Sequence, residues 1–253
     1  IRTRTPYLNT DYFDFEYPPE GGQHREIDVQ FWSSDRYVGR IMRNELGAFG
    51  YNFADGHQKG YPAAGGPSGG FFVRLVRGAE NYGVNDFVDN ENGTVTDQAS
   101  GLTWQQVDDG NVRNWEDALS YAEGLSLAGH DDWRLPNIKE LQSIVDYTRA
   151  PDARDGAPVG PAIDPALGVT ETESWFWSST TQLDNTSLGM YICFGQALSV
   201  DEHPNGDQVN AHGAGAQRSD PKSGNPADYA GGMGPQRDEV RILNYVRCVR
   251  GRS

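Results

Sequence analysis

The spacing of apolar and polar residues between positions 85 and 150 predicts short strands followed by two helices. Residues 85–105 contain β-rich runs separated by Asn-Gly at 92–93 and Ser-Gly at 100–101. Asn-Gly is the strongest short hairpin signal, so this stretch predicts three strands joined by two turns. Its carboxylates loosely resemble a calcium-binding loop, but position twelve is Ser100 where a glutamate is expected, which favours the hairpin.

Two amphipathic helices are predicted next. Asn114 is a suitable N-cap for the first helix, and Gly129 is expected to mark its exit. The second helix is expected to start near Pro136. The apolar residues at helical spacing are Trp115, Ala118, Leu119, Ala122 and Leu125 in the first helix and Ile138, Leu141, Ile144 and Val145 in the second. Each helix is expected to bury this face against a sheet.

The stretch HDDWRLP (130–136) lies between the helices. His130 with Asp131 and Asp132 has the composition of an acid–base pair or a metal corner. The structural interpretation is favoured: carboxylates and Arg134 fix a tight corner by hydrogen bonds, and Trp133 anchors the core. Beyond residue 150 strands and loops dominate, so the fold class is α+β.

Three blocks of sequence occur twice in the same order, which predicts a duplicated module. FWSS stands at 31–34 and 176–179, FGYNF at 49–53 corresponds to MYICF at 190–194, and FFVRLVRG at 71–78 corresponds to NYVRCVRG at 244–251. We therefore predict a tandem arrangement in which residues 85–253 form a complete module and residues 1–84 only the latter half of one. The other half is expected upstream of Ile1 or from other residues.

Tryptophans at equivalent or central positions are expected to be structural. These residues are Trp32 and Trp177 in the repeat, with Trp104 and Trp133 in the second module. If the copies correspond, Cys248 aligns with Leu75 at an apolar position that is expected to be buried, and Cys193 aligns with Asn52. A disulfide and two unpaired cysteines both remain open.

The second copy contains 28 extra residues before its last block, within a polar excursion that begins near Ser199. Its glycines and its return to a core strand favour an ordered loop over disorder. The side chains that could contact a ligand are Asp201, Glu202, His212, Arg218, Asp220, Lys222 and Asp228. The carboxylates Asp201, Glu202, Asp207 and Asp220 could hold calcium if they converge. Two interpretations of this excursion are equally favoured. It either contains a ligand site or is a surface loop whose Asp and Arg side chains bond to its own backbone.

Charge and composition restrict the partners. The 253-residue chain has a net charge of −15. Residues 1–84 contain nine Lys or Arg against ten Asp or Glu, so −14 falls on residues 85–253. This charge disfavours nucleic acid and anionic lipid. No run approaches 18 apolar residues, so membrane insertion is not expected.

Five motifs of the second module resemble, in order, the bacterial Lcl C-terminal domain family. They are FVDNENGTVTDQASGLTWQQ, NWEDALSYAEGL, GHDDWRLPNIKELQSIVDY, WFWSST and YVRCVRG, within residues 85–251. The resemblance implies a C-type-lectin-like fold with mixed or antiparallel sheets, two helices and long ordered loops. It also implies an extracellular or envelope-associated binding module, with some members acting as adhesins for sulfated polysaccharide.

Three classes of function follow. The leading hypothesis is a non-catalytic recognition or adhesion protein of a bacterial surface that binds glycan or protein through the excursion. The second is a self-associating subunit of a filament, sheath or surface layer. The aromatic segment 7–17 of the chain could be a strand at an interface between such subunits or an ordinary half-buried strand, and the half-buried strand is favoured. The third is an enzyme related to the formylglycine-generating fold. We do not expect enzyme activity, because no paired reactive cysteines or hydrolase spacing is present.

Overall fold

The chain folds into small antiparallel sheets and two short α-helices. The computed structural model describes residues 5–18, 29–64 and 71–251. The elements are β1 (Gln30–Arg36), β2 (Gly47–Asn52), β3 (His57–Pro62), β4 (Phe87–Asp89), β5 (Thr94–Asp97), β6 (Leu102–Gln105), α1 (Trp115–Glu123), α2 (Ile138–Ser143), β7 (Trp175–Thr181), β8 (Leu188–Cys193), β9 (Leu198–Glu202), β10 (Gln208–Asn210), β11 (Gln217–Pro221), the 3₁₀ helix η1 (Pro226–Tyr229) and β12 (Val249–Arg250). The fold class is therefore α+β, as predicted. No helix in the described part of the chain is long and apolar enough to cross a membrane.

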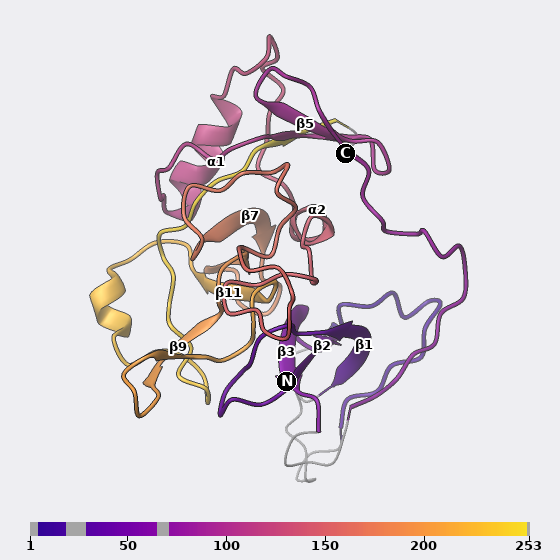
Figure 1. Cartoon of the computed structure of the whole chain (residues 1–253), viewed down its shortest axis with the longest axis vertical. Helices are drawn as coiled ribbons and strands as arrows, with labels where there is room; N and C mark the ends of the chain where they lie inside the picture. Colours follow the sequence, from indigo (N-terminus) through magenta and orange to yellow (C-terminus); the bar gives the residue numbers. More distant parts are fainter. Residues whose placement is uncertain (1–4, 19–28, 65–70, 252–253) are drawn as a thin grey trace.

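The predicted pair of hairpins is confirmed and forms one end of the molecule with α1 (Figure 1). Gly93 and Gly101 take positive φ values of 83° and 74° in the two turns, a conformation that glycine adopts without steric cost. The last strand, β12, returns from the far end of the sequence and pairs with β6, so the sheet order is β12-β6-β5-β4.

The first helix begins as predicted but ends earlier. The Asn114 side chain accepts a hydrogen bond from the backbone of Asp117 and caps α1. The prediction that Gly129 marks the exit was wrong, because the helix ends at Glu123 with Gly124 as C-cap. Gly129 lies instead in a tight turn, where its φ is 77°.

The second helix begins at Ile138, two residues after the predicted start near Pro136. Asn137 caps α2 because its side chain accepts from the Glu140 backbone while the Glu140 carboxylate accepts from the Asn137 backbone. Glu140 also receives two hydrogen bonds from Arg134, and Trp133 is only 3 % exposed. The 130–136 stretch thus has the structural corner geometry that the sequence favoured.

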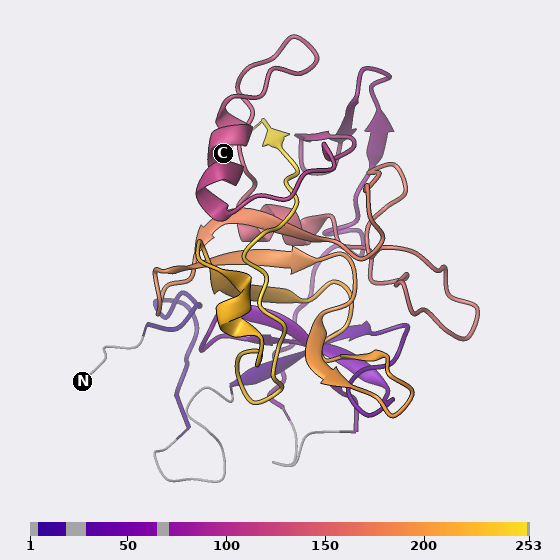
Figure 2. The ribbon, with the colours of Figure 1, turned by 90° about the vertical axis from the view of Figure 1, so that its left-hand side faces the viewer.

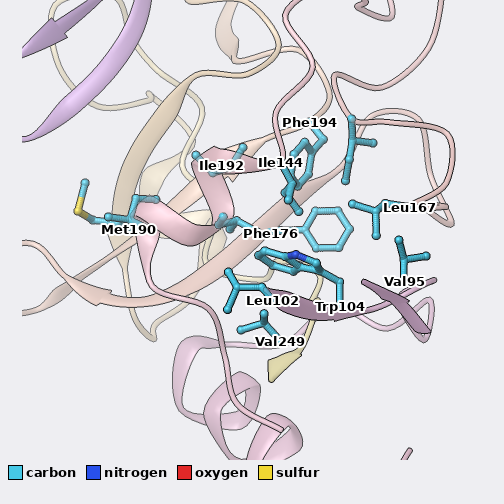
Figure 3. Packing of buried hydrophobic residues seen from close by; sticks show 13 residues of the cluster. Val95, Leu102, Trp104, Ile144, Leu167, Phe176, Met190, Ile192, Phe194 and Val249 are labelled. Atoms are coloured by element: carbon cyan, nitrogen blue, oxygen red, sulfur yellow. The ribbon is translucent and has the colours of Figure 1, made fainter. Parts of the chain in front are cut away.

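The central sheet, β7-β8-β11, is covered on both faces. Successive residues of β7 point to opposite sides, so Phe176 packs in one core cluster and Trp177 in another. Figure 3 shows the first cluster, in which Phe176 lies among Trp104, Leu167 and Phe194. The opposite face is covered by the helix α1 and the corner of Trp133. This two-sided burial explains why β8 has an almost unbroken apolar sequence.

The sheet β1-β2-β3 repeats the strand path of β7-β8-β11. In each sheet the FWSS strand pairs antiparallel with the next strand, and the register shifts after its tryptophan. Phe31 forms a parallel bridge to Phe72, and Phe176 forms the equivalent bridge to Tyr245. The duplication of the module stays a prediction, but these strands are built alike.

Side-chain contacts repeat with the strands. Phe31 meets Phe53 edge-on at 5.0 Å between ring centroids, and its counterpart Phe176 meets Phe194 edge-on at 5.3 Å. A guanidinium lies over each of these phenylalanines, from Arg74 at 5.7 Å and from Arg247 at 5.4 Å. The two sets of strands therefore share an aromatic–cation cluster as well as a strand order.

Burial distinguishes the two copies. Trp177 is fully buried and its indole donates to the carbonyl oxygen of Arg113, whereas Trp32 is half-buried against Phe71. The expectation that Leu75 is buried was wrong, since it is 90 % exposed while Cys248 is fully buried. The physical reason is that hairpins and a helix cover residues 244–251, and no described residues cover residues 71–78 in the same way.

The segment 7–17 is not a strand, contrary to the favoured interpretation. The Asn9 side chain accepts a hydrogen bond from the Asp11 backbone and starts a turn. Tyr12 is 81 % exposed, so the alternation of aromatic and acidic residues here does not correspond to one buried face.

The first sheet and the central sheet meet through β3 and β11 (Figure 2). The Gly60 backbone donates to the carbonyl oxygen of His212 at 2.8 Å. A Cβ atom on Gly60 would lie 2.4 Å from that oxygen, so only glycine permits the approach. The Gln58 backbone also donates to the Gln217 side chain, which joins the two sheets at a second point.

We predict that the two equivalent arginines differ sharply in their contribution to stability. Arg247 is fully buried, burial lowers its pKa to about 10, and it donates to three backbone carbonyl oxygens. Arg247→Met should lower the free energy of unfolding by about 3 kcal/mol, because those oxygens lose a charged donor. Exposed Arg74→Met is the matched control and should cost less than about 0.5 kcal/mol. Urea denaturation measures both, and equal losses would contradict the burial assigned to the two copies.

Candidate functional site

A polar hollow of about 400 Å³ lies where the excursion meets the first sheet and the loop after α2. Its lining comes from three separate parts of the chain: Arg40, Met42 and Asn44 between β1 and β2; Asp152, Arg154 and Glu173 between α2 and β7; and Gln196, Leu198, His203, Asp207, Gln208 and Asn210 after β8. We call it the polar hollow. Because these segments are distant in sequence, the site exists only in the folded chain.

A rigid hydrogen-bond network forms the floor of the polar hollow. Asn210 is 5 % exposed, and its amide donates to the Tyr37 hydroxyl at 2.9 Å. That hydroxyl donates in turn to Asp152, which also accepts from the Arg40 backbone. Burial, together with the adjacent Asp152 carboxylate, raises the pKa of Tyr37 well above its usual range. The Tyr37 hydroxyl therefore keeps its proton near neutral pH and can donate it to this hydrogen bond.

Two residues at the rim have left-handed backbone conformations although neither is glycine. Met42 has a φ of 48° and Asn44 a φ of 66°. The Met42 backbone donates to the Asn210 carbonyl oxygen at 2.8 Å, which fixes the rim to the floor. A left-handed conformation costs about 1–2 kcal/mol in a non-glycine residue, and such strain is concentrated at binding sites.

Both acidic and basic side chains line the polar hollow, and some of them already form hydrogen bonds within the protein. The Glu173 carboxylate accepts from both the backbone and the side chain of Gln196, so it is part of the wall. The Arg154 side chain is exposed and has no hydrogen bond or ion pair with the other described residues. This guanidinium, with its five fixed donors, is available to a ligand. The arrangement suits a polar ligand with several hydroxyl or carbonyl oxygens.

Three of the predicted ligand residues lie inside the fold instead. His212, Arg218 and Asp220 are 2 %, 4 % and 2 % exposed. The Arg218 guanidinium donates to the carbonyl oxygens of Leu198 and Glu239, while Asp220 accepts from the Tyr191 hydroxyl. These residues hold the excursion in place and do not face solvent.

A buried charge cluster surrounds Asp238, which the sequence interpretation did not single out. Its carboxylate lies 3.3 Å from the Arg218 guanidinium and 3.2 Å from Nε2 of His212, in ion-pair range but without hydrogen-bond alignment to the imidazole. Burial opposes ionisation of Asp238, but His212 and Arg218 outweigh it and keep its pKa well below the usual range. Burial lowers the pKa of His212, against the attraction of Asp238.

The remaining predicted ligand residues are spread over the surface. Asp201 pairs with Arg237 at 2.5 Å, and Glu202 and Asp228 are exposed. Lys222 lies 3.9 Å from the centre of the Trp115 ring and donates to Thr181. The structure therefore brings together Arg218 and His212, but not the predicted set as one site.

The calcium prediction is also corrected. Asp201, Glu202, Asp207 and Asp220 do not converge: within residues 5–18, 29–64 and 71–251, no group of three or more His, Cys, Asp or Glu could hold a metal ion. Asp220 is buried and bonded to Tyr191, and Asp201 pairs with an arginine, so neither carboxylate is directed to a shared centre.

A second hollow, of about 950 Å³, lies between the amino-terminal segment, the first sheet and α2. Rings of Tyr7, Tyr51 and Phe53 line one side of it, and amides of Gln58 and Gln142 line another. We call it the aromatic hollow. Sequence reasoning missed both hollows, although the excursion that supplies His203, Asp207 and Gln208 to the polar hollow was predicted to be ordered.

The two cysteines are unpaired and buried. Burial raises the pKa of both the Cys193 and the Cys248 thiol to about 12. At neutral pH both are protonated and behave as small apolar side chains of the core.

Comparison with known proteins gives one family match, at the helices, the corner and the start of the excursion. Residues 93–211 match the Lcl C-terminal domain family. This match supports the resemblance to that family that the motifs carry, and the family suggests a surface-associated protein. No curated protein and no solved structure matches the chain.

We predict that acid weakens the fold through His212. Its folded-state pKa is lowered, so the unfolded chain binds more protons between the two pKa values. The free energy of unfolding should therefore fall as the pH drops below about 6.5, the ordinary histidine pKa. His212→Gln should flatten this slope between pH 7 and pH 5 in urea denaturation, compared with the exposed control His130→Gln. An unchanged slope in His212→Gln would refute the assignment.

Proposed function

We propose that this chain is a non-catalytic recognition protein of a bacterial cell surface, which binds a neutral glycan through the polar hollow. The observation that carries the proposal is the convergence of three distant segments on a hollow with a rigid floor, a strained rim and the free guanidinium of Arg154. A C-type-lectin-like scaffold in an extracellular or envelope location would agree with the family match and with the motif resemblance.

Charge supports a neutral ligand over a sulfated one. The chain carries −15, which repels polyanions over a distance of about 8–10 Å at physiological salt. Within the polar hollow, Arg40 and Arg154 are offset by Asp152, Glu173 and Asp207. Sugar hydroxyls both donate and accept hydrogen bonds, so such a mixed lining can satisfy them. A polar loop of a protein ligand could fill the same hollow, because its amide and hydroxyl groups also both donate and accept hydrogen bonds.

The cysteines argue against a formylglycine-generating type of enzyme. A reactive thiol needs a lowered pKa and access to solvent. Cys193 and Cys248 are fully buried, and their pKa values are raised to about 12. The lining of the polar hollow also contains no Ser, Thr or Cys that could act as a nucleophile.

A structural subunit of a sheath or surface layer is the second candidate function. Exposed apolar side chains favour it, among them Tyr12 at 81 % and Leu75 at 90 % exposure. Sedimentation in dilute solution tests this candidate, because a sheath subunit should self-associate whereas a glycan receptor can remain monomeric.

The glycan proposal predicts a local effect of two substitutions. The ligand is a neutral oligosaccharide selected on a glycan array, which is run both with calcium and with a chelator. The substitutions Arg154→Gln and Gln208→Ala should each lower the affinity for it about tenfold. Each removes one or two hydrogen bonds, with a loss of about 1.4 kcal/mol in binding free energy. Isothermal titration calorimetry measures the affinities.

The matched control is Lys139→Gln, which removes a cation beside the aromatic hollow instead. Its affinity should equal that of the unmodified chain. If Lys139→Gln weakens binding while Arg154→Gln does not, the ligand occupies the other hollow. An array without any bound glycan would contradict the proposed ligand class.

A further inference from the structure

The same sequence motif is buried in one copy and exposed in the other. In the second copy Val246, Cys248 and Val249 are fully buried. The corresponding residues 73, 75 and 76 of the first copy are Val, Leu and Val, and they are 64 %, 90 % and 93 % exposed. An apolar residue at each of these positions would be surprising in a strand that stays in solvent.

The two segments nevertheless take the same path beside their sheets. Each starts with a parallel bridge to the phenylalanine of FWSS, and each places an arginine over that ring. The difference in burial therefore does not come from the segment or its own sheet. It comes from what covers the segment.

Residues 87–135 supply that cover in the second copy. Val249 exchanges two backbone hydrogen bonds with Arg134 and lies opposite Trp104 of β6. The Cys248 backbone bonds to both the backbone and the side chain of Gln105. Ala118 and Ala122 of α1 lie in the same core cluster as Cys248. A β-hairpin unit, the corner at Arg134 and a helix thus all contact this strand.

Residues 71–78 lack these partners and form what we call the 71–78 strip. Beyond the bridge at Phe72, no backbone hydrogen bond joins residues 73–77 to another part of the described chain. The Arg74 guanidinium donates to the carbonyl oxygen of Asp14, where Arg247 has three carbonyl acceptors. The side chains of Val73, Leu75 and Val76 are therefore exposed, and the backbone of residues 73–77 has no hydrogen bond to other described parts of the chain.

We propose that the 71–78 strip is the docking surface for a half-module with the architecture of residues 87–135, an antiparallel hairpin unit with one helix. Its last strand would add antiparallel beside Leu75 and Val76, its helix would cover Leu75, and its carbonyl oxygens would accept from Arg74. This occupant fits because the same chain already shows the motif with that cover in place.

Self-pairing of two strips fits less well. Each strip carries Arg74 and Arg77, both exposed, so an antiparallel pair of strips would bring four guanidinium groups together. Like charges on facing strands are destabilising. A half-module that presents carbonyl oxygens meets no such repulsion.

A thiol placed in the strip tests the proposal. Leu75→Cys is labelled with an aqueous thiol reagent in the 253-residue chain and in a longer chain that carries an added copy of residues 85–174 ahead of residue 1. The native cysteines are fully buried and protonated, so the introduced thiol is the reactive one. Val159→Cys, at a position 69 % exposed, reports general accessibility in both chains.

We expect rapid labelling in the 253-residue chain and protection on the order of 100-fold in the longer chain, because the docked strand opens only transiently. The protection should disappear when the added copy carries Trp104→Asp, which disrupts its core. Labelling that stays equally fast in both chains would overturn the proposal. Protection in the 253-residue chain that rises with protein concentration would overturn it in favour of self-association.

A second variant keeps the test decisive if the longer chain does not fold. The double substitution Leu75→Ser with Val76→Ser, in the 253-residue chain, should change the Tm by less than about 2 °C, since surface substitutions have small effects. A fall of more than about 5 °C would mean that the chain itself already covers the strip, which contradicts an open docking surface.

Discussion

The buried ion pair between Arg218 and Asp238 holds the excursion in the fold, and the polar hollow depends on it. The Arg218 guanidinium also donates to the carbonyl oxygens of Leu198 and Glu239, so it connects the beginning and the end of the excursion to the central sheet. Removing one partner of such a pair leaves an uncompensated buried charge, which costs about 3–5 kcal/mol. This long polar segment is ordered by buried charge pairing together with the pairing of β11 with β8 and the burial of small residues such as Ala214 and Ala216.

In the two sheets, local sequence determines how the strands pair, and distant parts of the chain determine how deeply they are buried. The FWSS strands, their antiparallel partners and the arginine over each phenylalanine are set by short stretches of sequence, and both copies form them. Burial of the last strand depends on a unit some 110 residues or more away in the chain, as the contacts of Val249 with Trp104 and Arg134 illustrate. Burial therefore differs between segments that look equivalent in sequence.

Sequence predicted the elements better than it predicted their partners. The cap at Asn114, the hairpins around Gly93 and Gly101 and the order of the excursion depend on local chemistry, and they were found as expected. Gly129 was misplaced because a glycine in a tight turn and one at a helix exit look alike in sequence.

The candidate site could be predicted only in outline. Charged residues such as His212, Arg218 and Asp220 look like solvent-facing ligands until the position of Asp238 is known. The polar hollow combines segments more than 100 residues apart, such as Arg40 and Arg154, and no pattern of spacing reveals that they meet. Arg154 stands out within the hollow only in the folded chain, where its exposed guanidinium has no hydrogen bond or ion pair with the other described residues.

Hydrogen exchange of the excursion tests the central claim most directly. The backbone amides of Ala211, which bonds to Ala197, and of Gly60, which bonds to His212, join the excursion to itself and to the first sheet. If the charge cluster orders the excursion, amides in residues 208–221 should be protected together with those of β8. Exchange of these amides at the rate of an unstructured peptide, while β7 and β8 remain protected, would contradict the account.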